Sequence, residues 1–252
     1  MAVELALTPD LRWNVDLAGQ AEAASDAGFA SLGVFADRAD GRARLAFDRA
    51  GIGCLDVLAL FISGNEDATL RAAERAAASA AVMGARWVAA VVRTAIDESA
   101  RRLVARCAGI LAEAGTAMAL EFSPLSSVTS MRLALELVDE VGEGSGVVID
   151  TWHFFFGDST WGDLERVPLE RIAYVQFDDA PTAESDDLFG ETMDRRVMPG
   201  DGSFELDRFV TTLLDRGFDG VVSVEVLNSE LSALPVSEFA RRAHAAAARF
   251  WW

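Results

Sequence analysis

The sequence predicts an α/β fold, a single (β/α)8 barrel that spans residues 1–252. Three observations lead to this prediction. Short apolar runs with strand character alternate with longer stretches of helical period along the whole chain. The strand-like runs are apolar on both faces, as the strands of a buried parallel sheet are. Eight such runs in 252 residues fit a barrel of this type, which typically needs about 250 residues.

The eight expected strands are short apolar runs bounded by polar or glycine-containing segments. They are Val3–Leu7, Ser31–Phe35, Leu55–Phe61, Trp87–Val92, Ala117–Phe122, Gly146–Asp150, Ile172–Phe177 and Val221–Val226. Amphipathic or alanine-rich stretches between them predict helices, among them Leu17–Ala27, Ala68–Met83, Ser99–Ala114, Ser130–Val141 and Glu205–Arg216, and a last helix at Val236–Phe250. Glycines such as Gly28 and Gly217 follow helical stretches, where a helix end requires a positive φ.

A doubly wound open sheet is the alternative fold. It requires a glycine-rich phosphate turn after an early strand, whereas the first strand here leads into Thr8-Pro9-Asp10. One connection is unusually long: residues 178–204 show no strong period and are rich in Asp, Glu, Pro and Gly. Long loops in compact domains are usually functional, and this one leaves the carboxyl end of the seventh strand.

The charge of the chain limits its partners. Its 22 basic residues are all arginine, and 40 acidic residues bring the net charge to −18. Without a basic run, such a chain is repelled by nucleic acid and by anionic membrane surfaces. The absence of lysine also excludes Schiff-base chemistry on a lysine.

The compartment is expected to be the cytoplasm. The N-terminal residues lack the basic region of a signal peptide, and no apolar run is long enough to cross a membrane. Cys54 and Cys107 lie far apart, so we expect two unpaired thiols in a reducing environment.

Each of the last four predicted strands carries one polar, metal-competent residue near its carboxyl end. These are Glu121, Asp150, Gln176 and Glu225. Catalytic groups of (β/α)8 barrels lie at the carboxyl ends of strands, so we expect these side chains to converge on the barrel mouth. His153 follows Asp150 by one helical turn and is expected beside them, roofed by Trp152 and Phe154–Phe156.

Three carboxylates that share one site repel each other and need a counter-charge or must be protonated. No arginine interrupts these strand runs, so a divalent metal ion is the expected counter-charge. Oxygen-rich ligation favours Mn or Mg, with Zn or Co as alternatives.

From Glu121 to the C-terminus the chain resembles the xylose-isomerase-like barrels, a superfamily of sugar phosphate isomerases and epimerases. The stretches that carry the resemblance are Leu120-Glu121-Phe122, Asp150-x-x-His153, the run from Tyr174 to Pro181, Arg196-x-x-Pro199-Gly200-Asp201-Gly202, and Gly217-Phe218-Asp219-Gly220 with Ser223-Val224-Glu225-Val226. The first 115 residues match this family only in their alternation of strands and helices.

The resemblance implies one divalent metal held by Glu121, Asp150, Gln176 and Glu225. It implies that Glu121 and Glu225 also serve as acid and base on opposite faces of the substrate, and that His153 and Arg196 contact the substrate. The implied reaction is isomerisation or epimerisation of a carbohydrate or polyol-carbonyl through an enediolate.

Two departures bear on the substrate. Relatives that dehydrate 3-dehydroshikimate resemble one another in an arginine after the third strand, but the corresponding segment here, Phe61–Asp67, holds no cation. Asp194 stands where a histidine is expected. Both favour a neutral polyol-carbonyl.

In the family pattern Gln176 replaces a more frequent histidine without loss of metal binding. The DNA-repair branch needs a histidine-rich zinc site, which two histidines exclude.

Two other functions stay open from the sequence. One is a metal-dependent lyase like the 3-dehydroshikimate dehydratases, and the other is a sugar-binding or subunit-forming barrel without turnover. The aromatic C-terminus, Phe250-Trp251-Trp252, either packs against the bottom of the barrel or forms a homodimer contact.

Overall fold

Eight parallel strands form a closed barrel in the computed structural model, which describes residues 3–142 and 144–252. Each strand pairs with the next along the chain, and β1 pairs with β8 to close the ring. The strands are β1 (Glu4–Leu7), β2 (Ser31–Phe35), β3 (Gly53–Ile62), β4 (Trp87–Val92), β5 (Ala117–Glu121), β6 (Ser145–Asp150), β7 (Ile172–Phe177) and β8 (Val221–Val224). The predicted (β/α)8 barrel is therefore confirmed.

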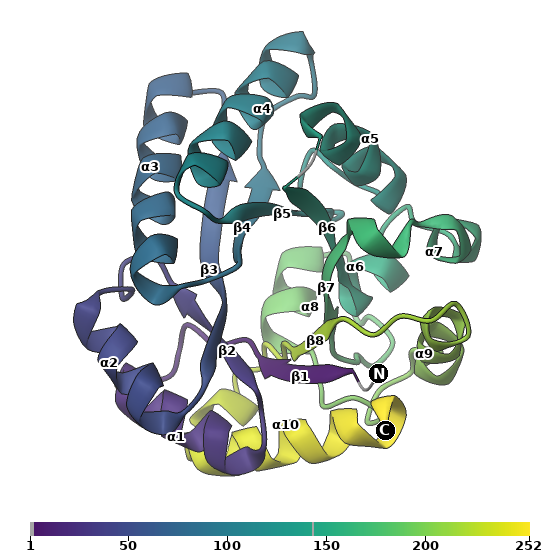
Figure 1. Ribbon diagram of the computed structural model, residues 1–252. Coiled ribbons are helices and arrows are strands. Elements are labelled where there is room, and N and C mark those ends of the chain that lie inside the picture. Colours follow the sequence, from purple (N-terminus) through teal and green to yellow (C-terminus); the bar gives the residue numbers. More distant parts are fainter. Residues whose placement is uncertain (1–2, 143) are drawn as a thin grey trace.

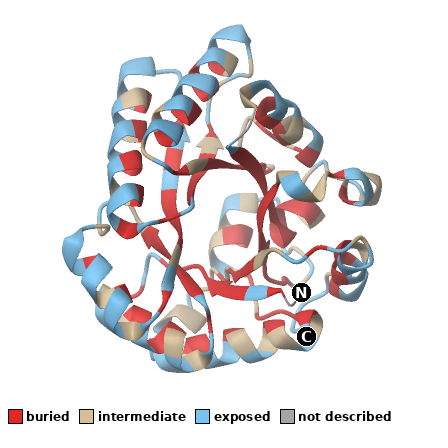
Figure 2. Cartoon of the chain, in the orientation of Figure 1, coloured by how far each residue is buried: buried red, intermediate tan, exposed pale blue. Residues whose placement is uncertain are grey.

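Most of the helices surround the barrel on the outside, whereas α8 (Leu188–Asp194) appears within the outline of the strand ring (Figure 1). They are α1 (Leu17–Ala27), α2 (Gly41–Ala50), α3 (Glu66–Met83), α4 (Glu98–Glu113), α5 (Met131–Val141), α6 (Thr151–Phe156), α7 (Trp161–Arg166), α8 (Leu188–Asp194), α9 (Leu206–Leu214) and α10 (Val236–Trp251), with 3-10 turns at Leu169–Arg171 and Leu231–Ala233. Figure 2 shows the strands buried and the outer helix faces exposed. Among the described residues, no helix is both long enough and apolar enough to cross a bilayer.

Helix α3 illustrates how the sequence builds these elements. Asn65 caps its first turn, with Oδ1 accepting from the Ala68 amide at 3.0 Å. The helix packs against the barrel through a stripe of buried alanines that includes Ala73 and Ala80. It ends at Gly84, whose φ of 64° places it in the left-handed region.

The core has two parts. The larger part lies between the strands and the helices, and a smaller cluster around Trp87, Val148 and Tyr174 fills the lower barrel interior. The Tyr174 hydroxyl donates to Oδ2 of Asp56 at 2.6 Å. Both residues of this polar pair are fully buried.

Most element boundaries agree with the sequence prediction within two residues, and β2, β4 and β7 agree at both ends. β8 ends at Val224, so Glu225 follows the strand rather than lying within it. The long connection after β7, predicted to lack periodic structure, contains helix α8. Its Asp187 cap accepts a hydrogen bond from Gly190, which local periodicity does not reveal.

The aromatic C-terminus packs against its own barrel. The ring centroids of Trp251 and Phe177 lie 5.4 Å apart, and Trp252 Nε1 donates to the Val3 carbonyl at 3.4 Å. These contacts match the packing alternative. A homodimer stays a prediction. Both cysteines are unpaired.

Candidate functional site

The polar residues predicted at the last four strand ends gather at one mouth of the barrel. Glu121 ends β5, Asp150 ends β6, Gln176 is the penultimate residue of β7 and Glu225 directly follows β8. A cavity of about 740 Å³ opens there, lined in part by Glu121, Gln176 and Glu225. Asp150 is fully buried beside it. The parallel register brings these side chains together, because all eight strands end at the same rim.

Arg196 supplies a counter-charge that the sequence analysis did not anticipate. Its side chain is buried, with 1% of the residue exposed. Nη1 donates to Asp150 Oδ2 at 2.8 Å, to Glu225 Oε2 at 3.1 Å and to Asp178. One guanidinium nitrogen therefore contacts three carboxylates, one of which, Asp178, was not among the predicted site residues.

Hydrogen bonds hold both the side chain and the backbone of Arg196 in place. Thr192, one turn earlier and at the end of α8, accepts from Arg196 Nε at 3.1 Å and from Nη2 at 2.8 Å through its hydroxyl. Asn228 donates its side-chain amide to the Arg196 carbonyl at 2.9 Å. The conformation of this part of the long connection therefore determines where the guanidinium of Arg196 lies.

Asp179 anchors the remainder of that connection. Its carboxylate accepts backbone hydrogen bonds from Gly200 at 3.1 Å, Gly202 at 3.0 Å and Phe204 at 3.0 Å. A side chain at position 202 would collide with this carboxylate, since a Cβ there would lie 2.3 Å from Asp179 Oδ1. The Pro-Gly-Asp-Gly run thus closes around one buried aspartate.

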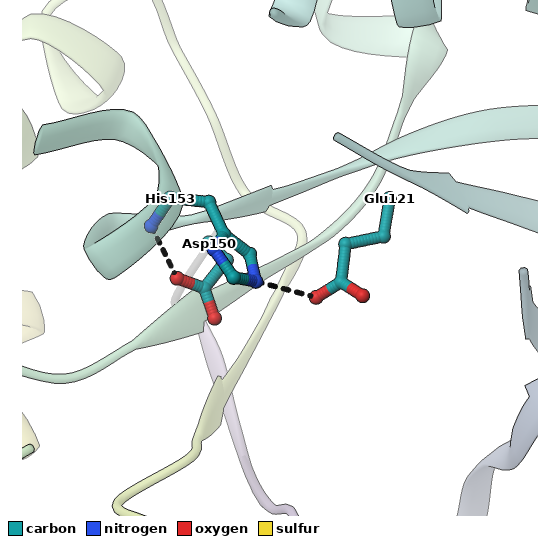
Figure 3. A group of neighbouring side chains, drawn as sticks. All are labelled: Glu121, Asp150 and His153. Atoms are coloured by element: carbon teal, nitrogen blue, oxygen red, sulfur yellow. Dashed lines mark hydrogen bonds and ion pairs between the residues drawn. The ribbon is translucent and has the colours of Figure 1, made fainter. Parts of the chain in front are cut away.

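His153 lies between two carboxylates (Figure 3). Asp150 caps helix α6, and its Oδ1 accepts from the His153 amide at 2.8 Å. On the other side, His153 Nε2 lies 3.4 Å from Glu121 Oε1. Asp150 therefore orients the histidine with one oxygen and Arg196 with the other.

Burial and neighbouring charges shift the pKa values of the carboxyl groups in this cluster. Burial raises the pKa of Glu225 well above its usual value; Arg196 opposes this shift and Asp150 reinforces it. Burial likewise raises the pKa of Asp178 to about 7, against the effect of Arg196. For Asp150, burial acts upward, but Arg196 and His153 lower its pKa overall.

The pKa of His153 is also raised, but for a histidine this shift favours the charged form. Burial disfavours the imidazolium, yet Asp150 and Glu121 more than offset this and raise the pKa of His153. The cluster holds four acidic groups, Glu121, Asp150, Asp178 and Glu225, against two basic ones, Arg196 and His153.

The residues present fit a divalent cation. One oxygen each of Glu121 and Asp150 and one nitrogen of His153 lie within 4.8 Å of one another. Gln176 donates Nε2 to Glu225 Oε1 at 3.1 Å, while its Oε1 is buried without a hydrogen-bond partner among the described residues. An unpaired buried acceptor beside excess carboxylates is what a cation would satisfy.

Residues from the first half of the barrel, from the loop after β5 and from helix α8 form the outer cavity wall. Its apolar side chains include Leu11, Phe61, Leu125 and Phe189, all exposed. Asp194, which stands where a histidine was expected, is exposed and pairs with Arg12 Nη1 at 2.8 Å. It therefore ties α8 to the loop after β1.

Comparison with known proteins agrees with the barrel fold. The family described as "Xylose isomerase-like TIM barrel" matches residues 21–250. The inosose isomerase of Halalkalibacterium halodurans is 30% identical over 151 residues, which cover 59% of this chain and 52% of the relative. The 3-dehydroshikimate dehydratase of Pseudomonas aeruginosa is 30% identical over 109 residues, 43% of this chain and 17% of that protein.

The matched region thus spans about half the length of the inosose isomerase and less of the dehydratase. Among solved structures, the IOLI protein with a bound zinc atom superimposes with a TM-score of 0.87 at 22% identity, covering 99% of both chains. That likeness concerns the fold. Because the family match covers most of the sequence, the chain belongs to the xylose isomerase-like TIM-barrel family.

Proposed function

We propose that this protein is a divalent-metal-dependent isomerase or epimerase of a sugar or sugar derivative, which abstracts a proton next to a carbonyl and forms an enediolate. The observation that carries the proposal is the pair Glu121 and Glu225, two carboxylates on the wall of one cavity beside a site that fits a cation. The inosose isomerase relatives support the reaction class.

In this proposal Glu121, Asp150, Gln176 and Glu225 hold the metal, which polarises the substrate carbonyl when bound. Mn or Mg is the proposed ion, with Zn or Co as alternatives. The IOLI protein, which shares this fold, is described with a bound zinc atom, and this supports a divalent ion in the proposal.

One glutamate removes the α-proton and the other returns a proton to the intermediate. Burial and the surrounding carboxylates raise the proton affinity of Glu225, which suits a group that must hold a substrate proton. His153 donates a hydrogen bond to the oxygen that gains charge. Asp150 and Glu121 raise the pKa of His153, which favours the protonated imidazole that such a donor needs.

Arg196 has a positioning role in this proposal. Its Nη1 donates to three carboxylates, so it fixes one oxygen of Asp150 and one oxygen of Glu225. The contact with substrate that the family resemblance implies for Arg196 stays a prediction.

A dehydratase is the second candidate. Elimination shares the first step, proton abstraction beside a carbonyl, and the two 3-dehydroshikimate dehydratase relatives favour it over a short matched region. The two reactions differ only in what the intermediate does next: a lyase expels a hydroxyl group, whereas an isomerase is reprotonated.

The test is exchange of the substrate α-proton with solvent deuterium, followed by NMR on manganese-loaded protein. Inososes, ketoses and the carboxylated hydroxyketone 3-dehydroshikimate serve as substrates. Glu225→Gln should retain the fold and lose exchange by a factor of about a thousand or more, since general acid–base catalysis contributes about 10²–10⁴. Glu230→Gln, a change at an exposed glutamate, is the control. Equal exchange in both variants, or none in the wild type, would contradict the proposal.

A further inference from the structure

We propose that Arg93 forms a carboxylate-binding subsite on the cavity wall, so that the substrate of this site carries a carboxylate. This inference rests on the proposed function, because the reaction itself takes place at the carboxylate cluster at the other end of the cavity. It adds the chemical class of the molecule that enters the cavity.

Arg93 directly follows β4 and lines the cavity. Its amide donates to the Ile62 carbonyl at 2.7 Å, which places its backbone beside the end of β3. The guanidinium carbon lies 4.0 Å from the ring centroid of Phe61, on that neighbouring strand. Stacking on the aromatic face restricts the long side chain and leaves its N–H groups free at the edges of the plane.

The charge of Arg93 is not used within the protein. No ion pair within 4.0 Å joins it to a carboxylate in the part of the chain that the structure describes, in contrast to Arg196, which contacts three. Two arginines line the cavity, and the second is committed to the carboxylate cluster. Arg93 is therefore the cation that a ligand in this cavity can reach.

Arg93 also lies at a suitable distance from the reacting groups. Val91 pairs with Glu121 in the β4–β5 register, so Arg93 is two residues further along its strand. With a rise of about 3.3 Å per residue and about 4.8 Å between strands, the two Cα atoms lie about 8 Å apart. A ring of monosaccharide size that bears a carboxylate can contact both side chains within about 740 Å³.

A carboxylate fits this subsite better than a phosphate. One planar guanidinium matches one carboxylate in charge and in fork geometry. A phosphate dianion would add a second negative charge to a cavity that already contains Glu121 and Glu225. Ser127, whose amide donates to the Val92 carbonyl at 2.9 Å, also lines the cavity beside Arg93 and offers a neutral hydroxyl.

This position revises an expectation from the sequence. The segment Phe61–Asp67 after the third strand holds no cation, which favoured a neutral substrate. The next strand supplies one instead, because the parallel register brings Arg93 next to Phe61. The sequence alone does not show that a cation after β4 can take the place of one after β3.

The experiment compares two cyclic hydroxyketones, 3-dehydroshikimate with a carboxylate and 2-keto-myo-inositol without one. Binding to the full manganese-loaded chain is measured by calorimetry, in wild type, Arg93→Met and Arg86→Met. Arg86 is the matched control, since it lies just before β4, at the opposite end of the barrel, with its guanidinium carbon 5.1 Å from the Trp87 ring centroid.

We expect Arg93→Met to weaken binding of 3-dehydroshikimate about tenfold, or about 1.4 kcal/mol, and to leave binding of 2-keto-myo-inositol unchanged. Arg86→Met should change neither. The tenfold effect should shrink as salt is raised from about 0.02 to about 0.5 M, because the guanidinium is exposed and its attraction is screened.

Three results would overturn the inference. The first is that Arg93→Met weakens the binding of both probes equally. The second is that 3-dehydroshikimate does not bind to the wild type. The third is that fructose 6-phosphate binds more tightly than 3-dehydroshikimate in a way that depends on Arg93. Binding that depends on Arg93 without any α-proton exchange would instead retain the subsite and contradict the proposed reaction.

Discussion

Replacing Arg196 by leucine would remove the one guanidinium that three buried carboxylates share. Leucine retains much of the apolar stem but none of the donors. The variant leaves Asp150, Asp178 and Glu225 without the contacts that Nη1 makes at 2.8 Å to the first and 3.1 Å to the last. It also frees Thr192 at the end of α8.

The expected loss follows from burial. Removing one partner of a buried ion pair costs about 3–5 kcal/mol, because the remaining charge cannot be solvated. Protonation offers relief, since burial already raises the pKa of Asp178 to about 7. We therefore expect a loss of about 3 kcal/mol in the free energy of unfolding at pH 6 and of about 5 kcal/mol at pH 8.

A divalent ion should recover part of this loss. Manganese at a hundred times its dissociation constant stabilises a folded protein by about 2.7 kcal/mol. The more negative cluster of the variant should bind the ion more tightly than the wild type does. Urea unfolding with and without manganese, at pH 6 and pH 8, measures both effects.

The control is Arg132→Leu, which breaks an exposed i,i+4 pair with Glu136 on α5. Such pairs contribute about 0.5 kcal/mol or less. If Arg196→Leu lost no more stability than this control, or if manganese stabilised the variant less than the wild type, the account of the cluster would be wrong.

Three further predictions concern separate parts of the molecule. Burial raises the pKa of Asp56 to about 7, so the folded chain keeps a proton that the unfolded chain releases above about pH 4, and stability falls as the pH rises between these values. Asp56→Asn should remove this pH dependence, so that its free energy of unfolding, measured with urea, rises relative to that of the wild type by up to about 4 kcal/mol between pH 4 and pH 8. A difference between the two proteins that does not change with pH would contradict this prediction. Glu121→Ala should lose the divalent ion that manganese-loaded wild type retains after gel filtration, by elemental analysis; equal metal content would remove Glu121 from the proposed ligands. Asp179→Ala should cost about 3 kcal/mol and speed amide exchange at Gly200 and Gly202, because three backbone donors lose their acceptor; unchanged exchange would refute the anchoring role.

The barrel was predictable because its signals are local. An apolar run such as Val147–Asp150 fills a strand buried on both faces, and its first charged residue marks the strand end. The same pattern of strand ends predicts that Glu121, Asp150 and Gln176 lie at one rim of the barrel. Parallel topology then converts strand ends that are remote in sequence into neighbours.

The counter-charge was not predictable because it depends on the path of a long connection. Arg196 reaches the cluster only after helix α8 and the hydrogen bonds of Asp179 have set the course of the chain. The pair Asp56–Tyr174 was missed for a related reason. A polar residue is visible within the run Leu55–Phe61, but its partner is 118 positions away and depends on how the barrel closes.

The two halves of the barrel carry different tasks, which has a consequence for how such a protein can evolve. The carboxylates of the site come from the ends of β5 to β8, whereas Phe61 and Arg93, which line the outer cavity, come from β3 and from the residue after β4. Mutations in the first half can therefore change which molecule fits without disturbing the groups that move protons. A library restricted to the loops after β1 to β4 would explore new substrates on an inherited chemistry.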